Sequence, residues 1–488
     1  MAFGVYWRTM APTVYGLDSA ELTTGAYVLG IVHAPGSPLF LLLGHLFTWL
    51  PFGDVGYRLN LLSAGTAAGA LGFVYAIVVR LTGQRLVALA TAWLLGFSYY
   101  YWITAVAAEL YAPHACFVAA LIWMGLQWRD EHRPLHLCLF ALVYGLGLSN
   151  HLSLSLLTPG LVWLVASDGA SLWRRPGLVM AALACAASGA AVYLYLPLRS
   201  AVAPMNFARA LGVDVGTWKG FWWMITCRMF ATQLFALGPR QWAGELGKYV
   251  HYLWSNFTGL GCALGVIGLV DDGPRRRQLH LALGLMFAGH LGFMLTYGVG
   301  DKDEMLVPTY LIWSLWIACG AAALGRYLGR WTQAGMAAAG GLLLLMSSYS
   351  LVANWRYADI SDDWSARTRG EVIFRALPPG AMYVGTWADV PILEYLQLVE
   401  AQRPDVQLVN LFFVPVKDLS HLPADHTQAD HVLYTSAPQL LSPNKTSAFE
   451  YVADCDCYRL ESPTSEARTC EAGANACPAR YDDLGIER

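Results

Sequence analysis

The stretch 86–108 reads LVALATAWLLGFSYYYWITAVAA, which is 23 consecutive residues without a charged side chain. About 20 such residues are enough for a helix to cross the hydrocarbon core of a bilayer. Similar uncharged stretches occur at 178–198, 306–325 and 334–353. The sequence therefore predicts an integral membrane protein, with 86–108 as one of its helical spans.

The overall composition agrees with this class of protein. The chain has 488 residues, of which 56% are hydrophobic and 13% are charged, and a soluble domain carries about twice that share of charge. The net charge of −3 gives no sign of a nucleic-acid partner. Further spans are predicted at 59–79, 110–128, 249–270 and 278–298, with two short ones within 135–167. The expected fold is mostly α-helical and polytopic, with about 10–11 transmembrane helices.

Lysine and arginine in short loops mark the cytoplasmic side of a membrane protein. In the short loops of one set only Arg58 and Lys302 are basic. The other set carries the basic pairs and one triplet, at Arg80/Arg85, Arg129/Arg133, Arg174/Arg175, Arg275–Arg277 and Arg326/Arg330. We therefore expect the second set to be cytoplasmic. The loops 15–58 and 199–248, and everything after residue 353, are then extracytoplasmic.

The first residues fit this topology poorly. Met1–Thr13 is too short to span a bilayer and carries Arg8, although an outer position for the following loop needs a span ahead of it. The expectation is a misassigned start or a truncated first helix. No basic region followed by an apolar core, as in a signal peptide, is evident.

After residue 353 the composition becomes that of a water-soluble segment. Helices are predicted at 361–375 and 390–400, and strands at 381–385, 406–412, 431–436 and 449–460. This alternation predicts that the membrane domain, 1–353, is followed by a small extracytoplasmic α/β domain, 354–488.

Four cysteines, Cys455, Cys457, Cys470 and Cys477, crowd the end of the chain. In an oxidising compartment they predict two disulfides. Neighbours in a Cys-X-Cys strand point to one face but are awkwardly spaced for bridging each other. We therefore expect Cys455 and Cys457 each to pair with Cys470 or Cys477, and both patterns stay open. A zinc site is the rival interpretation, and the absence of a nearby histidine disfavours it, so no metal site is predicted.

Two acids, Asp18 and Glu21, lie three residues apart in the first outer loop. On a helix they share a face. Carboxylates beside a bilayer are costly and are functional candidates for that reason, and a border position can tune them for general-base catalysis. The alternative is a capping box at the start of a helix. Both roles are compatible, because a cap would fix the rotamer of a catalytic aspartate.

A proline-bracketed turn follows at His33-Ala-Pro-Gly-Ser-Pro38. Its prolines fix backbone angles, and Gly36 allows close approach of a ligand. The turn makes His33 a binding candidate; the alternative is a plain helix-breaking loop.

Three arginines on the predicted outer face, Arg58, Arg199 and Arg228, run against the charge bias of the loops. Arginine grips phosphate through two parallel hydrogen bonds, so they are candidate phosphate-binding residues. The alternative is that each reaches toward lipid headgroups.

Three more polar residues lie at outer ends of predicted spans. Asn60 follows Arg58, Glu109 ends the uncharged stretch, and His151 occupies an outer turn. For Glu109, a role in binding and a role in helix packing are both open.

Taken together, these segments resemble a family of bacterial multi-span proteins known as a domain of unknown function. Its eukaryotic relatives are protein O-mannosyltransferases of the GT-C glycosyltransferase superfamily. The resemblance covers nearly the whole chain to about residue 415. It is carried by Ala11-Pro12-Thr13, Asp18-Ser-Ala-Glu21, His33-Ala-Pro-Gly36, Arg58-Leu-Asn60-Leu-Leu-Ser63, Glu109-Leu-Tyr-Ala112, Ser149-Asn150-His151, Tyr195-Leu-Pro-Leu-Arg199, Pro308-Thr-Tyr-Leu311, Leu377-Pro-Pro-Gly380, Arg403-Pro-Asp405-Val406 and Val409-Asn410-Leu411.

The resemblance implies an inverting transferase that uses a polyprenyl-phosphate-linked sugar, mannose-like, on the extracytoplasmic side of a bacterial inner membrane. In GT-C enzymes an aspartate of the first outer loop is the usual catalytic residue, and Asp18 occupies that place, followed by Glu21. The expected acceptor is a hydroxyl, either on protein Ser/Thr or on a glycan. A lipid-borne donor needs no nucleotide site, and no Gly-rich phosphate loop is present. No cofactor is predicted.

Two features depart from the family pattern: Ala20 stands where glycine is usual, and the first helix is short. The short first helix, together with a cysteine-rich tail that resembles no known family, motivates one alternative of a different class. In it the chain is a non-catalytic GT-C relative that acts as a membrane scaffold or as a subunit of an envelope complex.

Overall fold

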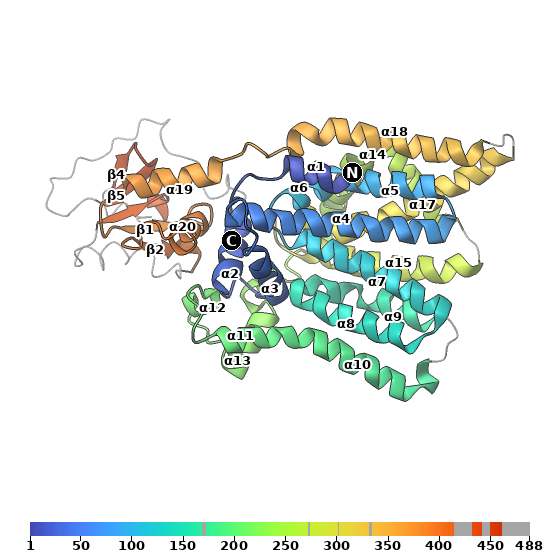
Figure 1. The fold of residues 1–488 in the computed structure, drawn as a ribbon, viewed down its shortest axis with the longest axis horizontal. Coiled ribbons are helices and arrows are strands. Elements are labelled where there is room, and N and C mark those ends of the chain that lie inside the picture. Colours follow the sequence, from blue (N-terminus) through green and yellow to red (C-terminus); the bar gives the residue numbers. More distant parts are fainter. Residues whose placement is uncertain are drawn as a thin grey trace.

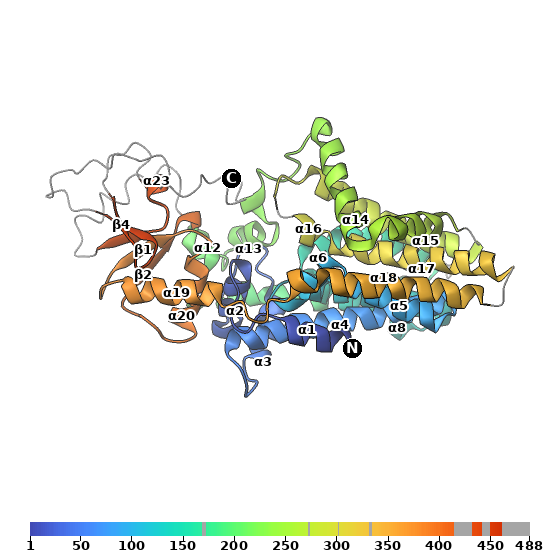
Figure 2. The same cartoon turned by 90° about the horizontal axis from the view of Figure 1, so that it is seen from above.

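The computed structural model describes residues 1–167, 172–271, 274–300, 302–330, 334–413, 432–441 and 449–460. Elements up to α18 form a helical part, and those from α19 onward form an α/β part. The long helices lie side by side, and the α/β part lies beyond one end of them (Figure 1). Between the two lie α2 (Asp18–Val28), α3 (Pro38–Phe47) and α12 (Phe207–Ala210). The chain crosses from α18 to α19 at this same end (Figure 2).

Several helices of the helical part are long and apolar enough to cross a membrane. Within the described residues six single helices meet this condition, together with one bent pair, α5 and α6. The protein is therefore an integral, multi-pass membrane protein, as predicted. The helices are α1 (Ala2–Thr9), α4 (Val55–Thr82), α5 (Arg85–Gly96), α6 (Tyr99–Val106), α7 (Tyr111–Glu131), α8 (Pro134–Asn150), α9 (Thr158–Ala166), α10 (Pro176–Ala190), α11 (Tyr195–Arg199), α13 (Trp218–Ile225), α14 (Pro239–Val270), α15 (Pro274–Thr296), α16 (Lys302–Met305), α17 (Val307–Gly329) and α18 (Gly335–Ala358).

The predicted span at 86–108 is a bent pair of helices, not one straight helix. The helix stops at Gly96 and restarts at Tyr99, and the two halves meet at 69°. A break inside a bilayer needs partners for the backbone groups that it frees. Neighbouring helices supply them: the Asn354 amide donates to the carbonyl of Phe97 at 2.8 Å, and Asn256 Oδ1 accepts from the N–H of Tyr100 at 3.1 Å.

The loops that carry the basic residues gather at one end of the helical part. Figure 1 shows the α4–α5 and α17–α18 turns at the end opposite the α/β part. Arg80, near one of these turns, donates to the carbonyl of Leu126 at 2.8 Å and so joins α4 to α7.

Helices α14 and α17 approach each other through glycines. A Cβ added at Gly268 would lie 1.8 Å from the carbonyl oxygen of Trp316, and one at Gly320 would lie 1.9 Å from that of Leu264. Backbone therefore touches backbone. In lipid, where helices gain little from the hydrophobic effect, such close packing is a main source of association.

The α/β part contains a five-stranded sheet in the order β2-β1-β3-β5-β4. Strands β2, β1 and β3 are parallel, whereas β5 runs antiparallel to β3 and to β4. Most predicted elements are confirmed, but 449–460 is a hairpin of two strands. The elements are α19 (Ser365–Ala376), β1 (Met382–Gly385), α20 (Val390–Leu398), β2 (Gln407–Asn410), β3 (Leu433–Thr435), α23 (Pro438–Leu441), β4 (Phe449–Val452) and β5 (Cys457–Leu460).

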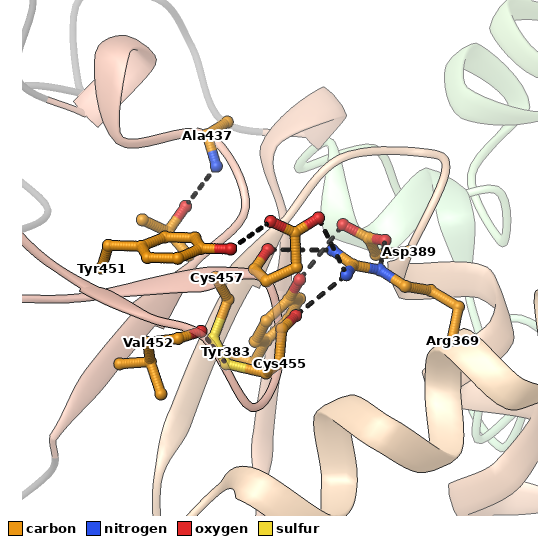
Figure 3. Close-up of a disulfide and its surroundings, with 10 residues drawn as sticks. Arg369, Tyr383, Asp389, Ala437, Tyr451, Val452, Cys455 and Cys457 are labelled. Carbon is orange, nitrogen blue, oxygen red and sulfur yellow. Dashed lines mark hydrogen bonds and ion pairs between the residues drawn. A yellow bond between two sulfur atoms is a disulfide. The ribbon is translucent and has the colours of Figure 1, made fainter. Parts of the chain in front are cut away.

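The cysteine pairing expected from the sequence is wrong for two of the four residues. Cys455 and Cys457 form a disulfide with each other (Figure 3). The argument from strand geometry fails because Cys455 and Asp456 lie in the β4–β5 turn, where Asp456 has a φ of 47°. The turn brings the two Cα atoms to 5.1 Å, within the usual range for a bridge. Cys470 and Cys477 lie outside the described residues.

The glycine contacts predict the effect of a single methyl group. Gly320→Ala should destabilise the folded protein by about 1–3 kcal/mol, because the added carbon meets rigid backbone rather than a flexible side chain. Gly341→Ala on α18 is the matched control, since an added Cβ there has no heavy atom within 4 Å. The measurement is the thermal unfolding midpoint in detergent. Equal midpoints for the two variants would contradict the described packing.

Candidate active site at the junction

Helix α2 joins the two parts of the molecule. It begins after Leu17, whose φ is 56°, and its first turn packs against α20. Val14 and Ala20 are buried in the same apolar cluster as Ile392 and Tyr395 of α20. The acids of the first turn of α2 are thereby held at the boundary between the helical part and the α/β part.

A buried acid, Glu21, binds His33 twice. One carboxylate oxygen accepts the backbone N–H of His33 at 2.7 Å, and the other lies 2.5 Å from ring Nδ1. The Glu21 side chain is only 1% exposed. The opposite ring nitrogen, Nε2, lies 3.9 Å from Oδ2 of Asp18. The structure thus places His33 between the two predicted acids.

This arrangement favours a proton on the histidine. Burial by itself lowers the pKa of His33, but the charges of Glu21 and Asp18 and the hydrogen bond that the ring donates to Glu21 outweigh it and raise the pKa to about 10. Burial also raises the pKa of Glu21, against the opposing effect of His33. At neutral pH the pair therefore keeps a proton, and the ring presents positive charge toward Asp18.

Asp18 is fixed by a residue of the α/β part. Its Oδ1 accepts a hydrogen bond of 2.7 Å from the indole N–H of Trp387, in the β1–α20 loop. The capping alternative is wrong for this side chain: Asp18 is the first helical residue, Leu17 is the N-cap, and no side-chain cap bond forms. Its charge still suits the positive end of the helix dipole. The side chain is 39% exposed and so accessible.

Aromatic rings surround this acid pair. His33 meets the edges of Phe207 and Trp387, at centroid distances of 6.2 and 6.3 Å. Phe207 also contacts Phe413 at 4.7 Å, and Trp387 contacts Phe412 at 5.3 Å. The rings come from α12, the β1–α20 loop and the segment after β2, so they form one wall across the two parts of the molecule.

A cavity of about 410 Å³ opens beside the acids. It lies between the segment 204–210 and the elements α20 and β2, and its volume falls in the range of small-molecule sites. Glu21 and Trp387 line it together with five polar side chains that the sequence did not single out for this site. These are Asn206, Arg209, Glu394, Gln397 and Asn410.

Two of the arginines predicted to bind phosphate donate to backbone carbonyls instead. Arg58 donates to the carbonyls of Thr48, Phe52 and Gly53 and so holds the α3–α4 turn. Arg199 donates to the carbonyls of Val28 and Leu29 and so caps the end of α2. A helix end and a tight turn leave carbonyls without partners, and a long cation nearby satisfies them. The structure therefore gives these arginines a positioning task and does not point them at a ligand.

Asn60 likewise holds the chain that leads into α2. Its amide donates to the carbonyls of Ala11 and Thr13, both at 2.9 Å. Arg228 is exposed, and its side chain has no hydrogen bond or ion pair within the described residues. Of the three predicted arginines, it alone keeps its donors available.

The last two predicted residues differ in their surroundings. Glu109 is near the acids: burial, followed by the charges of Glu304 and Asp18, raises its pKa well above the usual value. His151 lies in the turn after α8, where its Nδ1 contacts the Ser153 hydroxyl at 2.7 Å. Burial and the charge of His33 lower the pKa of His151 to about 4, so it is neutral at physiological pH.

Two of the residues missed by sequence reasoning share one structural signal. Trp387 follows β1, and Asn410 ends β2, a parallel neighbour of β1. Ligands of open α/β sheets bind at the carboxyl ends of such strands. The predicted order of strand, helix and strand in 381–412 contained this signal, although it could not show that this edge faces α2.

The fold resembles those of two solved structures. The structure superposes on a crystal structure of ArnT from Cupriavidus metallidurans bound to undecaprenyl phosphate with a TM-score of 0.62, covering 95% of this chain and 97% of that one at 12% identity. An oligosaccharyltransferase of Archaeoglobus fulgidus, in complex with zinc and sulfate, matches at 0.52 over 90% of this chain and 67% of that one, at 11% identity. The predicted GT-C fold is confirmed.

Sequence comparison gives the nearer relationship. Residues 18–174 match the family Protein O-mannosyl-transferase TMEM260 N-terminal domain. Protein O-mannosyl-transferase TMEM260 of Mus musculus is 30% identical over 44% of this chain, and that of Dictyostelium discoideum is 23% identical over 83%. The chain spans 31% and 56% of these two relatives. The predicted resemblance to eukaryotic O-mannosyltransferases is thereby confirmed.

The ion pair of Glu21 and His33 predicts how the stability of the folded protein depends on pH. Because the folded state raises the pKa of His33 from 6.5 to about 10, the stabilisation is complete below pH about 6.5 and is lost as pH rises through about 10. Unfolding midpoints in detergent should fall across this window by the equivalent of a few kcal/mol, on the order expected for such a shift. His33→Gln should be less stable at pH 6 and should lose this pH dependence.

His251→Gln is the control for this experiment, because His251 is exposed on α14. It should follow the wild-type profile. A His33→Gln profile parallel to that of the wild type would contradict the described ion pair.

Proposed function

We propose that this chain is a membrane glycosyltransferase that moves a mannose-like sugar from a polyprenyl-phosphate donor to the hydroxyl group of a serine or threonine in an acceptor protein. The observation that carries the proposal is the accessible Asp18 carboxylate. It faces the protonated ring of His33 and accepts a hydrogen bond from Trp387, which lines the cavity together with Glu21. The names of the relatives and the undecaprenyl phosphate bound to ArnT support the choice of chemistry.

In the proposed reaction Asp18 acts as the general base. Its Oδ2 takes the proton of the acceptor hydroxyl while the hydroxyl oxygen attacks C1 of the sugar. The bond between C1 and the phosphate oxygen breaks, its electron pair leaves with the polyprenyl phosphate, and the configuration at C1 inverts. A single base on the attacking side fits an inverting displacement, since no covalent sugar–enzyme intermediate is needed.

The other groups of the site have supporting roles in this proposal. Glu21 orients His33, whose positive ring lies 3.9 Å from Asp18 and holds that carboxylate in place. Arg209 is the cationic side chain of the cavity lining, and its Nη2 donates to the carbonyl of Ser200. We assign the other guanidinium donors of Arg209 to the departing phosphate, in place of Arg58 and Arg199, which do not line this cavity. Arg228 remains a second candidate because its donors are available.

The proposal also sets the topology. The basic loops lie at the end of the helical part away from the α/β part, and the charge bias of such loops favours the cytoplasm. The acids, the cavity and the domain 354–488 would then lie outside a bacterial inner membrane, after a membrane domain 1–353. A lipid-borne donor reaches that side without a nucleotide.

The proposal predicts a large loss of transfer in Asp18→Asn. A positioned base supplies about 10²–10⁴-fold in rate, and asparagine keeps the shape and the acceptor for Trp387 but cannot take the proton. The measurement is transfer of radiolabelled mannose from a polyprenyl phosphate to acceptor protein by purified chain, with folding checked by the unfolding midpoint.

Asp454→Asn, an exposed acid in the β4–β5 turn, is the matched control and should transfer at the wild-type rate. Wild-type transfer by Asp18→Asn would remove Asp18 from the mechanism. Absence of transfer in the wild type itself, across donors and acceptors, would favour the scaffold alternative.

A further inference from the structure

One buried amide on the wall of the cavity has an unpaired donor. Asn410 ends β2 and is 5% exposed, and its Oδ1 accepts the N–H of Phe412 at 3.0 Å. Its Nδ2 is buried and has no hydrogen-bond partner within the described residues. Buried amide donors are nearly always paired in folded proteins. An unpaired one that lines a cavity is a donor available to a ligand.

A carboxyl group lines the same cavity from α20. Glu394 is half-buried, and its side chain makes no hydrogen bond or ion pair in the part of the chain that the structure describes. Burial, and then the charge of Glu21, raise its pKa to about 8. At neutral pH it holds a proton, so it can both donate and accept a hydrogen bond.

Flat apolar surface completes the lining. Phe207, Trp387 and Phe413 all border the cavity, and the Phe207 and Phe413 rings are 4.7 Å apart. Trp387 cannot turn away freely, because its indole N–H is bonded to Asp18. The cavity therefore combines aromatic surface with one unpaired donor and one group of mixed donor and acceptor character.

This combination matches the chemistry of a pyranose. A sugar ring has C–H groups on its faces and hydroxyls around its edge, and each hydroxyl both donates and accepts. Aromatic surface suits the faces, whereas Asn410 and Glu394 suit the edge. Arg209 at the same cavity adds a cation for a phosphate joined to the sugar, which an uncharged acceptor peptide would not require.

We propose that this cavity is the subsite for the hexosyl group of the donor lipid, and that Asn410 and Glu394 of the α/β part recognise its hydroxyls. The inference rests on the proposed function and extends it, because it assigns sugar recognition to the α/β part. Glu21 and Trp387, which line the cavity and contact His33 and Asp18, mark the end where C1 would lie.

The test compares two lipids that differ only in the sugar. Farnesyl phosphate and mannosyl farnesyl phosphate are titrated into the full chain in nanodiscs, and their dissociation constants are measured calorimetrically. The wild type should bind the mannosyl lipid at least roughly tenfold more tightly, since one or two hydrogen bonds correspond to about that factor.

Asn410→Ala and Glu394→Ala should each remove most of this preference and leave the affinity for farnesyl phosphate unchanged. Glu450→Ala on β4, where Glu450 pairs with Arg459, is the matched control and should keep the full preference. Unfolding midpoints identify any variant that fails to fold. If one of the two variants does not fold, the lipid preference of the other is the test.

Three results would overturn the subsite. They are an equal affinity of the wild type for both lipids, an unchanged preference in both variants, or a parallel loss of affinity for both lipids. A variant that keeps the donor preference but raises the KM for the acceptor would assign the cavity to the acceptor. Loss of the proposed function looks different, because a protein that prefers the mannosyl lipid but transfers nothing retains the subsite.

Discussion

The junction depends on the buried hydrogen bonds between Glu21 and His33. A carboxylate that is removed from water is costly unless it is paired, and here both oxygens are used by one residue. The pairing ties the loop after α2 back onto the first turn of that helix. The same loop continues into a bridge from Ile31 to Asn206, so the position of α12 follows from that of α2. The cavity wall is therefore built outward from one ion pair.

The C-terminal end of α2 is also held by hydrogen bonds. Arg199 donates to the carbonyls of Val28 and Leu29, and the Tyr195 hydroxyl donates to the carbonyl of Gly30 at 2.6 Å. Sequence reasoning singled out Arg199 by its predicted place on the outer face and assigned it to phosphate. Its partners could not be known, because residue type shows that a cation is present but does not show which carbonyls need it. Arg58 follows the same rule at the α3–α4 turn.

Other predictions succeeded or failed for similar reasons. The membrane helices were predictable because long uncharged apolar stretches mark them in the sequence. The grouping of Asp18, Glu21 and His33 was predictable because one short segment contains all three. The break at Phe97 was not, because an uncharged stretch looks the same whether or not Asn256 and Asn354 supply partners for its backbone. Glu394 and Asn410 were missed because each is an ordinary residue of its own element. Their significance comes from the distant segment 204–210.

This distribution divides the proposed chemistry between two parts of the chain. The base and its histidine are on the helical part, whereas the groups assigned to the sugar are on the α/β part. A misplacement of about 1 Å can cost a catalytic site on the order of 100-fold, so the two parts need a firm connection. Arg367 of α19 supplies one: its guanidinium binds both oxygens of Glu400, at 2.6 and 2.8 Å, and reaches Asp54 of the helical part at 3.5 Å. Because Asp54 also caps α4 through the N–H of Tyr57, this ion-pair network links the α/β part to the start of a membrane helix. The α/β part is thus fixed to the membrane helices as one wall of the proposed site.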